Sequence, residues 1–303
     1  MRKFIVTGID IRRHRVTAVT LKRQHNILSL LNCESIAVTD DIFSENEVIS
    51  YQKIVNKLAG VRKRLPFFQH RAAISVPELA VMTRTLRLSL HDHDKSLESW
   101  LVYQAFSEKT SLSRESVCLD YVVLDEGYQV YAAKREVIES RLQAIRQAGL
   151  KPVLVDTEKQ AFLQFLLEAM SHFQRREWLL LDVGEEMVVV GFISTELNFY
   201  RQFPFPGQKS DPTLERILQE VQRFLSLHQS SLPNGIWVKG SSGVYQVLSS
   251  GLSKLFDGPI ERFTTAAVFQ TSVPVADHLW GVIPLAAGSA LRGLIALENG
   301  YAA

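Results

Sequence analysis

Two short stretches of the chain place an aspartate directly before a tight turn between two strand-like runs. In the first stretch Asp10 is followed by Arg12 and Arg13, and in the second Asp182 is followed by Gly184. Glycine lets backbone N–H groups approach an anion closely, and arginine can bind a phosphate through two parallel hydrogen bonds. These residue types are typical of a phosphate-binding site.

The first turn differs from the usual composition of a tight hairpin. Positions 12–15 are arginine, arginine, histidine and arginine, whereas such turns usually contain glycine or asparagine, which tolerate positive φ. The missing glycine removes the easiest approach of the backbone to a phosphate. Two interpretations of the arginines stay open: a solvated basic turn, or a phosphate contact made by the side chains.

The elements that must position these turns occur twice. Residues 4–21 and again 178–193 have the pattern strand, turn, strand, and each pair is followed by a third strand. Helices with apolar residues at a spacing of 3.6 then follow, at 45–65 and 211–229. The chain is therefore expected to contain an internal repeat of an α/β unit.

A block between the two repeats has a different order of elements. Residues 77–147 alternate as strand, helix, strand, strand and helix, with a hairpin at Asp125-Glu126-Gly127. We expect three units: a first subdomain at 1–76 plus 148–173, a small inserted subdomain at 77–147, and a second half at 174–303. The last helix is expected to pack back near the first half.

The composition bounds the class of protein. The chain has 303 residues, 46% hydrophobic and 22% charged, which are ordinary globular values, and its net charge of +2 indicates no particular polyanionic partner. Cys33 and Cys118 are too few for a disulfide framework and are expected to be buried, reduced thiols of a cytoplasmic protein. The most apolar segment, 279–297, contains a proline, three glycines and an arginine, so we expect no transmembrane helix.

Six segments, taken in order, resemble the type IV pilus assembly protein PilM family and its HofM-type relatives, which are linked to competence and DNA uptake. They are residues 8–21, 72–88, 154–166, 179–192, 236–252 and 284–293. The most specific piece is the pattern Val155-Asp156-x-Glu158-x-x-Ala161, directly before the second half. The resemblance implies an actin-like (ribonuclease H-like) duplicated fold with an inserted α+β subdomain of the cell-division-actin type and a reduced lid in the second half.

The same resemblance implies an adaptor rather than an enzyme. Proteins of this family bind the cytoplasmic N-terminal tail of a bitopic inner-membrane protein (PilN-like or HofN-like), which lies as an extended peptide in a groove that involves the inserted subdomain. We expect a cytoplasmic protein recruited to the inner membrane, a possible homo-oligomer, and no direct contact with nucleic acid. The partner-binding residues are not identified by the sequence; our guess is the apolar loop at 203–207 with the outward face of 82–88.

The resemblance also implies a cleft for ATP and Mg²⁺. If a nucleotide binds, the matching positions are Asp10, Arg12, Arg13, Asp182, Gly184 and Gly240. Several departures argue against it: Glu185 and Glu186 follow the second turn, Ser241 replaces a glycine of the adenosine motif, and only 208–210 stand where the family has a lid. A like-charge pair at about 4 Å costs roughly 4 kcal/mol at an effective dielectric near 20.

We therefore expect ATP binding to be weakened or lost, with no cofactor, no bound metal and no catalytic residue. The first alternative is an active ATP-binding member of the family whose nucleotide state controls assembly. The second is a small-molecule kinase of the actin-like fold, which the turn residues disfavour.

At the junction of the halves, Asp156 and Glu158 could position water in an active ATPase, whereas capping of the next helix by Asp156 or Thr157 is the structural alternative.

Two further stretches allow a functional and a structural interpretation. His91, Asp92, His93 and Asp94 resemble a metal-ligand cluster, but consecutive residues rarely converge on one ion, so a solvated loop with a helix cap is favoured. The basic run at 59–73 could bind anionic lipid or nucleic acid, or could be a solvated helix end whose cations complement the helix dipole.

Overall fold

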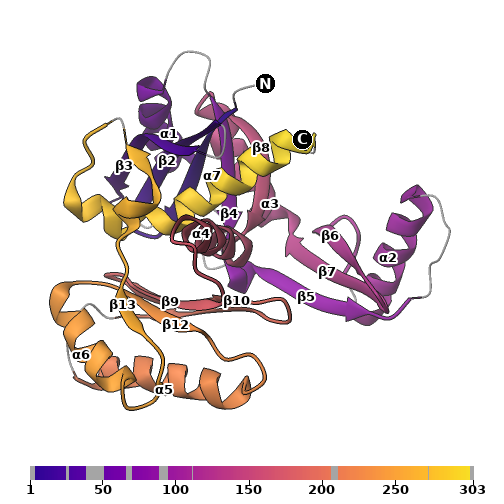
Figure 1. Ribbon diagram of the computed structural model, residues 1–303. Helices are drawn as coiled ribbons and strands as arrows, with labels where there is room; N and C mark the ends of the chain where they lie inside the picture. The colour runs from indigo at the N-terminus through magenta and orange to yellow at the C-terminus, as the bar shows by residue number, and fades with distance from the viewer. Residues whose placement is uncertain are drawn as a thin grey trace.

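The computed structural model describes residues 4–24, 27–38, 51–65, 70–88, 95–110, 112–205, 211–271 and 273–300. Within these ranges the chain forms three sheets and the helices that cover them (Figure 1). The histidine–aspartate stretch at 91–94 and the short connection at 206–210 lie outside the described residues.

Two of the sheets share one strand order and one pattern of strand directions. The first has the order β3 (Ile27–Ala37), β2 (Arg15–Gln24), β1 (Ile5–Arg12), β4 (Arg71–Val76) and β8 (Lys151–Thr157), with the short β14 (Gln270–Thr271) beyond β3. The second has the order β11 (Asn198–Pro204), β10 (Met187–Ile193), β9 (Trp178–Val183), β12 (Gly235–Lys239) and β13 (Ile260–Arg262). In both sheets three consecutive strands pair antiparallel, and two more continue the sheet in parallel. The predicted internal repeat is present.

Helices cover both faces of these two sheets. Between the sheets lie α4 (Glu158–His172) and α7 (Ile283–Glu298), while α1 (Tyr51–Arg64) with α3 (Arg135–Gln147) and α5 (Asp211–Leu227) with α6 (Ser242–Leu252) cover the outer faces (Figure 1). This arrangement explains why β1 and β9 are buried along nearly their whole length. Two repeats thus pack against one central pair of helices.

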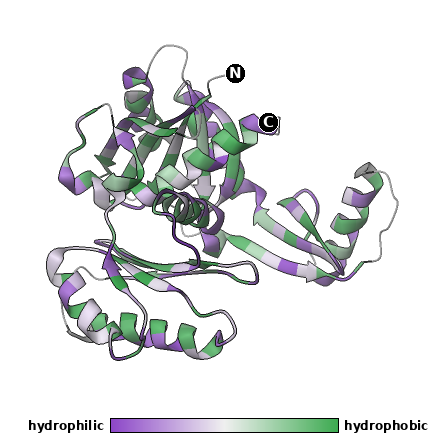
Figure 2. Ribbon diagram, in the orientation of Figure 1, coloured by the Kyte–Doolittle hydropathy of each residue, from purple (hydrophilic) through white to green (hydrophobic). Residues whose placement is uncertain are grey.

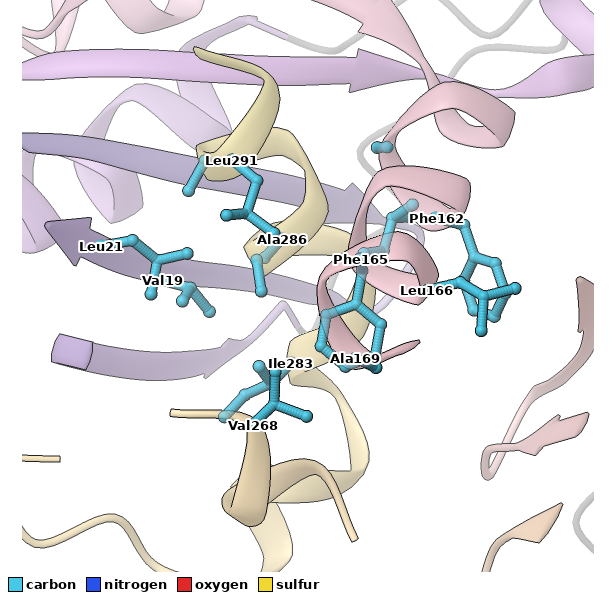
Figure 3. Packing of buried hydrophobic residues seen from close by; sticks show 14 of the residues in the cluster. Val19, Leu21, Phe162, Phe165, Leu166, Ala169, Val268, Ile283, Ala286 and Leu291 are labelled. Carbon is cyan, nitrogen blue, oxygen red and sulfur yellow. The ribbon is translucent and has the colours of Figure 1, made fainter. Parts of the chain in front are cut away.

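The central helices approach their neighbours at backbone distance. A Cβ atom on Gly8 of β1 would lie 1.8 Å from the Ala286 carbonyl oxygen of α7, and one on Gly288 would lie 1.9 Å from the Ala161 carbonyl oxygen of α4. Around these contacts the side chains of α4, α7 and β2 form a continuous apolar core (Figure 3). The most apolar segment of the sequence is therefore a buried core helix, and no helix among the described residues is long and apolar enough to cross a membrane.

The inserted block forms a sheet of its own. Its strands have the order β5 (Val81–Leu86), β7 (Gly127–Lys134) and β6 (Val117–Leu124), and α2 (Lys95–Thr110) packs on one face of this sheet. In Figure 1 this unit projects away from the two large sheets. Figure 2 shows that it mixes hydrophobic and hydrophilic residues, whereas α4 is mostly hydrophobic. The β6–β7 turn is closed by Gly127 at φ +133°, a backbone conformation that favours glycine.

Some elements differ from the sequence prediction. The strand expected at 81–90 ends at Leu86 as β5, and its four middle residues are exposed instead of alternating. The two phenylalanines of the loop guessed to contact a partner, Phe203 and Phe205, are 4% and 6% exposed and belong to the core under α5. That part of the guess is wrong, because the rings pack inward against the second sheet.

Candidate functional site

The two hairpins meet at a cleft between the repeats. A small cavity of about 70 Å³ is lined by Asp10 and Arg12 from β1 and by Asp182 and Gly184 from the second hairpin. Four of the predicted site residues are therefore brought together. Arg13, at the tip of the first turn, is exposed and does not line this cavity.

The geometry of the first turn explains its lack of glycine. The turn has two residues, Arg13 and His14, between the paired positions Arg12 and Arg15. Neither turn residue has a positive φ, and the His14 carbonyl accepts a hydrogen bond of 2.7 Å from the N–H of Val38. Since no residue of the turn enters the left-handed region, a glycine is not required there.

The first aspartate belongs to a buried ion cluster. Arg12 lies 3.1 Å from the Asp10 carboxylate through Nε and 3.2 Å from the Glu158 carboxylate through a terminal nitrogen. Burial alone would lower the pKa of the Arg12 guanidinium, but the two carboxylates raise it above its usual value. Burial raises the pKa of Glu158, and Arg12 opposes this shift. Arg12 therefore points inward to two acids of its own chain.

The second aspartate also has a cation of its own chain. Asp182 and Lys239 are neighbours on the parallel strands β9 and β12, and the Lys239 ammonium donates to the Asp182 carboxylate. The same ammonium donates to the Gly281 carbonyl at 2.7 Å. Both side chains are buried, so the pair is sheltered from water and salt. Each hairpin aspartate thus has a fixed positive partner.

The glutamates after the second turn lie at the surface. Glu185 and Glu186 are exposed, and the Glu185 carboxylate is 89% exposed and 4.0 Å from the guanidinium of Arg15. Water screens such charges more strongly than a dielectric near 20 assumes. The value of roughly 4 kcal/mol expected for the repulsion between these glutamates and a triphosphate therefore overestimates that repulsion.

A larger cavity of about 640 Å³ opens beside the second hairpin. Gly184 and Gly240 line it, together with Arg262 and His278 from later segments. Ser241 also lines it, and its hydroxyl oxygen accepts a hydrogen bond of 3.4 Å from the N–H of Val244, capping α6. The residue that replaces the expected glycine therefore has a structural role at the start of this helix.

A third hollow lies between the inserted subdomain and the first sheet. This groove has a volume of about 450 Å³. Residues 118–122 of β6 and 155–157 of β8 line it, and Val76, Ile138 and Arg292 add to its wall. Successive residues of a strand point to opposite faces, so the run 118–122 lines the groove where it reaches the edge of β6. Val81 of β5 and 131–133 of the central strand β7 line it as well, so the groove lies against one face of the three-stranded sheet and reaches the edges of β6 and β8.

The strands that border the groove each have one open side. Among the described strands β6 pairs only with β7, and β8 pairs only with β4. In each strand an aspartate accepts from the N–H of the next residue: Asp120 from Tyr121 at 2.9 Å, and Asp156 from Thr157 at 2.7 Å. These two N–H groups are therefore hydrogen-bonded to side chains of their own strands.

The junction motif has a structural role that the sequence suggested only in part. Thr157 caps α4 by accepting a hydrogen bond of 3.1 Å from the N–H of Gln160, which is one of the two capping interactions expected from the sequence. Asp156 instead accepts from Arg292 of α7 at 2.7 Å, and Glu158 holds Arg12. Sequence reasoning missed Lys239 and Arg292; the only local signal for Lys239 was a cation at the end of an apolar strand, before Gly240.

Comparisons with known proteins agree with this architecture. A family model for type IV pilus assembly protein PilM matches residues 8–226. A solved structure described as a PilM–PilN type IV pilus biogenesis complex has a TM-score of 0.72 at 18% identity, covering 95% of this chain and 98% of that chain. No curated protein matches the chain in sequence.

Two other structures are more distant. Ethanolamine utilization protein EutJ from Carboxydothermus hydrogenoformans has a TM-score of 0.50 at 10% identity, covering 96% of this chain and 90% of that chain. A Bacteroides thetaiotaomicron protein described as having an actin-like ATPase fold has a TM-score of 0.47 at 10% identity, covering 85% of this chain and 90% of that chain. The likeness to the PilM–PilN structure, at a TM-score of 0.72, confirms the expected actin-like fold.

Proposed function

The chain belongs to the type IV pilus assembly protein PilM family, and on this premise we propose that it is an adaptor of the pilus or DNA-uptake machinery. In this proposal it binds the cytoplasmic tail of a PilN-like bitopic inner-membrane protein and is recruited to that membrane from the cytoplasm. The similar PilM–PilN complex supports the choice of partner. The observation that carries the proposal is the groove between β6 and β8.

The groove suits an extended peptide because of its two open strand edges. A peptide that lies along an unpaired strand gains main-chain hydrogen bonds, and pockets for alternate side chains add selectivity. At the start of β6 the Val117 carbonyl already accepts from the Tyr103 hydroxyl at 3.1 Å and from Arg135 at 3.0 Å. The Tyr103 hydroxyl also interacts with the backbone of Leu119, so the part of β6 offered to a peptide begins after Leu119.

The walls of the groove favour a peptide that is mainly apolar. Leu119, Val122 and Val155 from the two strands line it, and Val81 and Ala132 from β5 and β7 join them. Burying an apolar side chain in such a pocket contributes roughly 1.5–3 kcal/mol. A tail with two or three apolar side chains would thus gain much of its affinity from these walls.

A pair of neighbouring valines provides the test of this site. Val122 lines the groove and is 55% exposed, whereas Val123 is 63% exposed and does not line it. We expect Val122→Glu to weaken binding of a synthetic cytoplasmic tail of the PilN-like protein by at least about tenfold, and Val123→Glu to change it by less than about threefold. Calorimetric titration with that peptide measures both variants.

Equal affinities of the two valine variants would reject the groove as the site. If the wild-type chain does not bind the peptide at all, the adaptor function itself is wrong. Since both side chains are exposed on one strand, a loss of folding common to both variants would be visible in their thermal unfolding.

We further propose that ATP binding is weakened or lost. For Asp10 and Asp182 to bind Mg²⁺, and for phosphates to lie between the hairpins, two ion pairs would have to separate. Arg12 would have to leave Asp10, and Lys239 would have to leave Asp182. The residues of the cleft therefore do not fit Mg·ATP as they are arranged. Separating a buried ion pair without replacing both partners leaves an uncompensated charge, which costs about 3–5 kcal/mol.

A nucleotide-binding member remains the second candidate, because the cavity of about 640 Å³ beside Gly184 and Gly240 has room for a ligand. Calorimetric titration with Mg·ATP separates the two proposals. We expect no saturable binding up to about 1 mM, whereas a ligand with a Kd near 10 μM would stabilise the fold by about 2.7 kcal/mol at that concentration. Micromolar binding that Asp10→Ala abolishes would favour the nucleotide-binding alternative.

A further inference from the structure

Basic residues gather at one edge of the first sheet, where β4 and β8 begin and α1 and α3 end. Arg71 and Lys151 are direct neighbours on the two parallel strands, and the Lys151 N–H donates to the His70 carbonyl at 2.7 Å. Arg62, in the last turn of α1, lies against Gly149 just before Lys151. We call Arg62, Lys63, Arg71 and Lys151 the basic edge.

The basic edge carries an excess of positive charge within the described part of the chain. Among the described residues, none of its four cations forms an ion pair with a carboxylate, whereas the nearby Arg64 pairs with Glu34 at 2.8 Å. Lys63, Arg71 and Lys151 are exposed. Burial, and the proximity of Arg62 and Lys151, lower the pKa of His70, which agrees with a positive potential at this edge.

The helix dipole explains only part of this cluster. Cations in the last turn of a helix complement its negative end, which accounts for Arg62 and Lys63 in α1. Arg71 and Lys151 begin strands, where no helix dipole favours them, and Arg71 lies over the ring of Phe4 at 5.7 Å. The helix dipole therefore accounts for two of the four cations, and a contact with an aromatic ring for Arg71, whereas Lys151 has neither.

We propose that the basic edge binds the surface of a membrane that contains anionic lipid. Each lysine or arginine held near such a surface is attracted to its negative potential. A compact patch on a chain whose net charge is only +2 suits a planar surface better than a nucleic acid, which needs a longer row of phosphate contacts. The choice of a membrane rests on the proposed function, because the partner's tail brings the chain there.

The position of the edge is compatible with simultaneous tail binding. Lys151 begins β8, and the residues of β8 that line the groove are at its other end, 155–157. Strand geometry separates Lys151 from Thr157 by about 20 Å. In Figure 1 the edge lies where β1 begins and α7 ends, on the side away from the second sheet. The chain can thus present this edge to the membrane while a tail of several residues reaches the groove.

Vesicle flotation with the purified full chain tests the proposal without any partner protein. We expect binding to vesicles of phosphatidylcholine with 30% phosphatidylglycerol at about 50 mM salt, weaker binding at about 300 mM salt, and none to phosphatidylcholine alone. The variant Arg71→Gln/Lys151→Gln should reduce the bound fraction by about tenfold or more. The control Arg223→Gln/Lys254→Gln removes the same charge from exposed sites of the second half and should change it by less than twofold.

Three outcomes would overturn the proposal: no binding to the anionic vesicles at low salt, an equal loss in both double variants, or charge-dependent binding of duplex DNA in place of vesicles. The result is independent of the adaptor function, because the vesicles contain no protein. The Arg71/Lys151 variant should keep its affinity for the tail peptide, and Val122→Glu should keep its affinity for vesicles. A chain that binds vesicles but no tail would contradict only the proposed function.

Discussion

In the cleft between the two hairpins, the residues Asp10, Glu158 and Asp182 are at most 9% exposed, and the carboxylate of each contacts a cation of the same chain. In the groove between β6 and β8, Asp120 is exposed and accepts only from the N–H of Tyr121 among the described contacts. Both hollows lie beside a strand end of the same duplicated fold, but their polar groups have different partners.

This difference indicates which hollow is prepared for a ligand. Buried charges that neutralise each other stabilise the closed arrangement and offer little to a charged ligand, because separating them is costly. Open strand edges beside apolar walls let a peptide add main-chain hydrogen bonds. The groove also contains the Asp156–Arg292 ion pair, but that pair lies in its wall and does not occupy the edge of β6. The groove is thus the better candidate for a binding site. The ion pairs of the cleft are better suited to holding the two repeats together.

Removal of Arg12 should have the largest effect on the cleft. Arg12→Ala leaves the buried carboxylates of Asp10 and Glu158 without their shared cation, so we expect the free energy of unfolding to fall by about 3–5 kcal/mol. Urea denaturation followed by circular dichroism measures the change. Arg13→Ala, one position along in the exposed turn, is the control and should cost less than about 1 kcal/mol. Similar losses in the two variants would show that the cleft does not depend on this cluster.

Breaking the pair of Asp182 and Lys239 should lower the free energy of unfolding by a smaller amount, and a second substitution should restore most of it. Lys239→Met leaves the Asp182 carboxylate buried and unpaired, and we expect the free energy of unfolding to fall by about 2–3 kcal/mol. In Asp182→Asn/Lys239→Met no charge remains, so most of that stability should return. If the double variant is as unstable as the sum of the single ones, the two residues are not coupled, and the comparison of the hollows fails for this half.

The duplicated fold could be predicted because its signals are local. The pattern strand, aspartate, turn, strand occurs at both hairpins, and helices α1 and α5 have apolar residues at helical spacing. The inserted subdomain was visible from its hairpin at Gly127 and from the helix that ends before Gly149. None of these features requires contacts between distant parts of the chain.

The partners of the site residues could not be predicted, because they are far apart in sequence. Lys239 is 57 positions from Asp182, and Arg292 is 136 positions from Asp156. Only the parallel register of β9 with β12, and the position of α7 between the sheets, bring these groups together. For the same reason the sequence did not identify the residues of the groove, which come from two separate sheets.

The ionisation of Glu158 allows a finer test of the cleft, with the smallest expected effect. Burial raises the pKa of this carboxyl above its usual value near 4.5, and the attraction of Arg12 cancels part of the shift. The folded chain then keeps a proton that the unfolded chain has released, so this residue lowers the free energy of unfolding as pH rises from about 4.5 through the folded pKa. Urea titrations of the wild type and of Glu158→Gln between pH 4 and pH 8 measure this. The stability of the wild type relative to the variant should decrease with pH; an increase would mean that the Arg12 pairing outweighs burial and that the cleft favours the charged form.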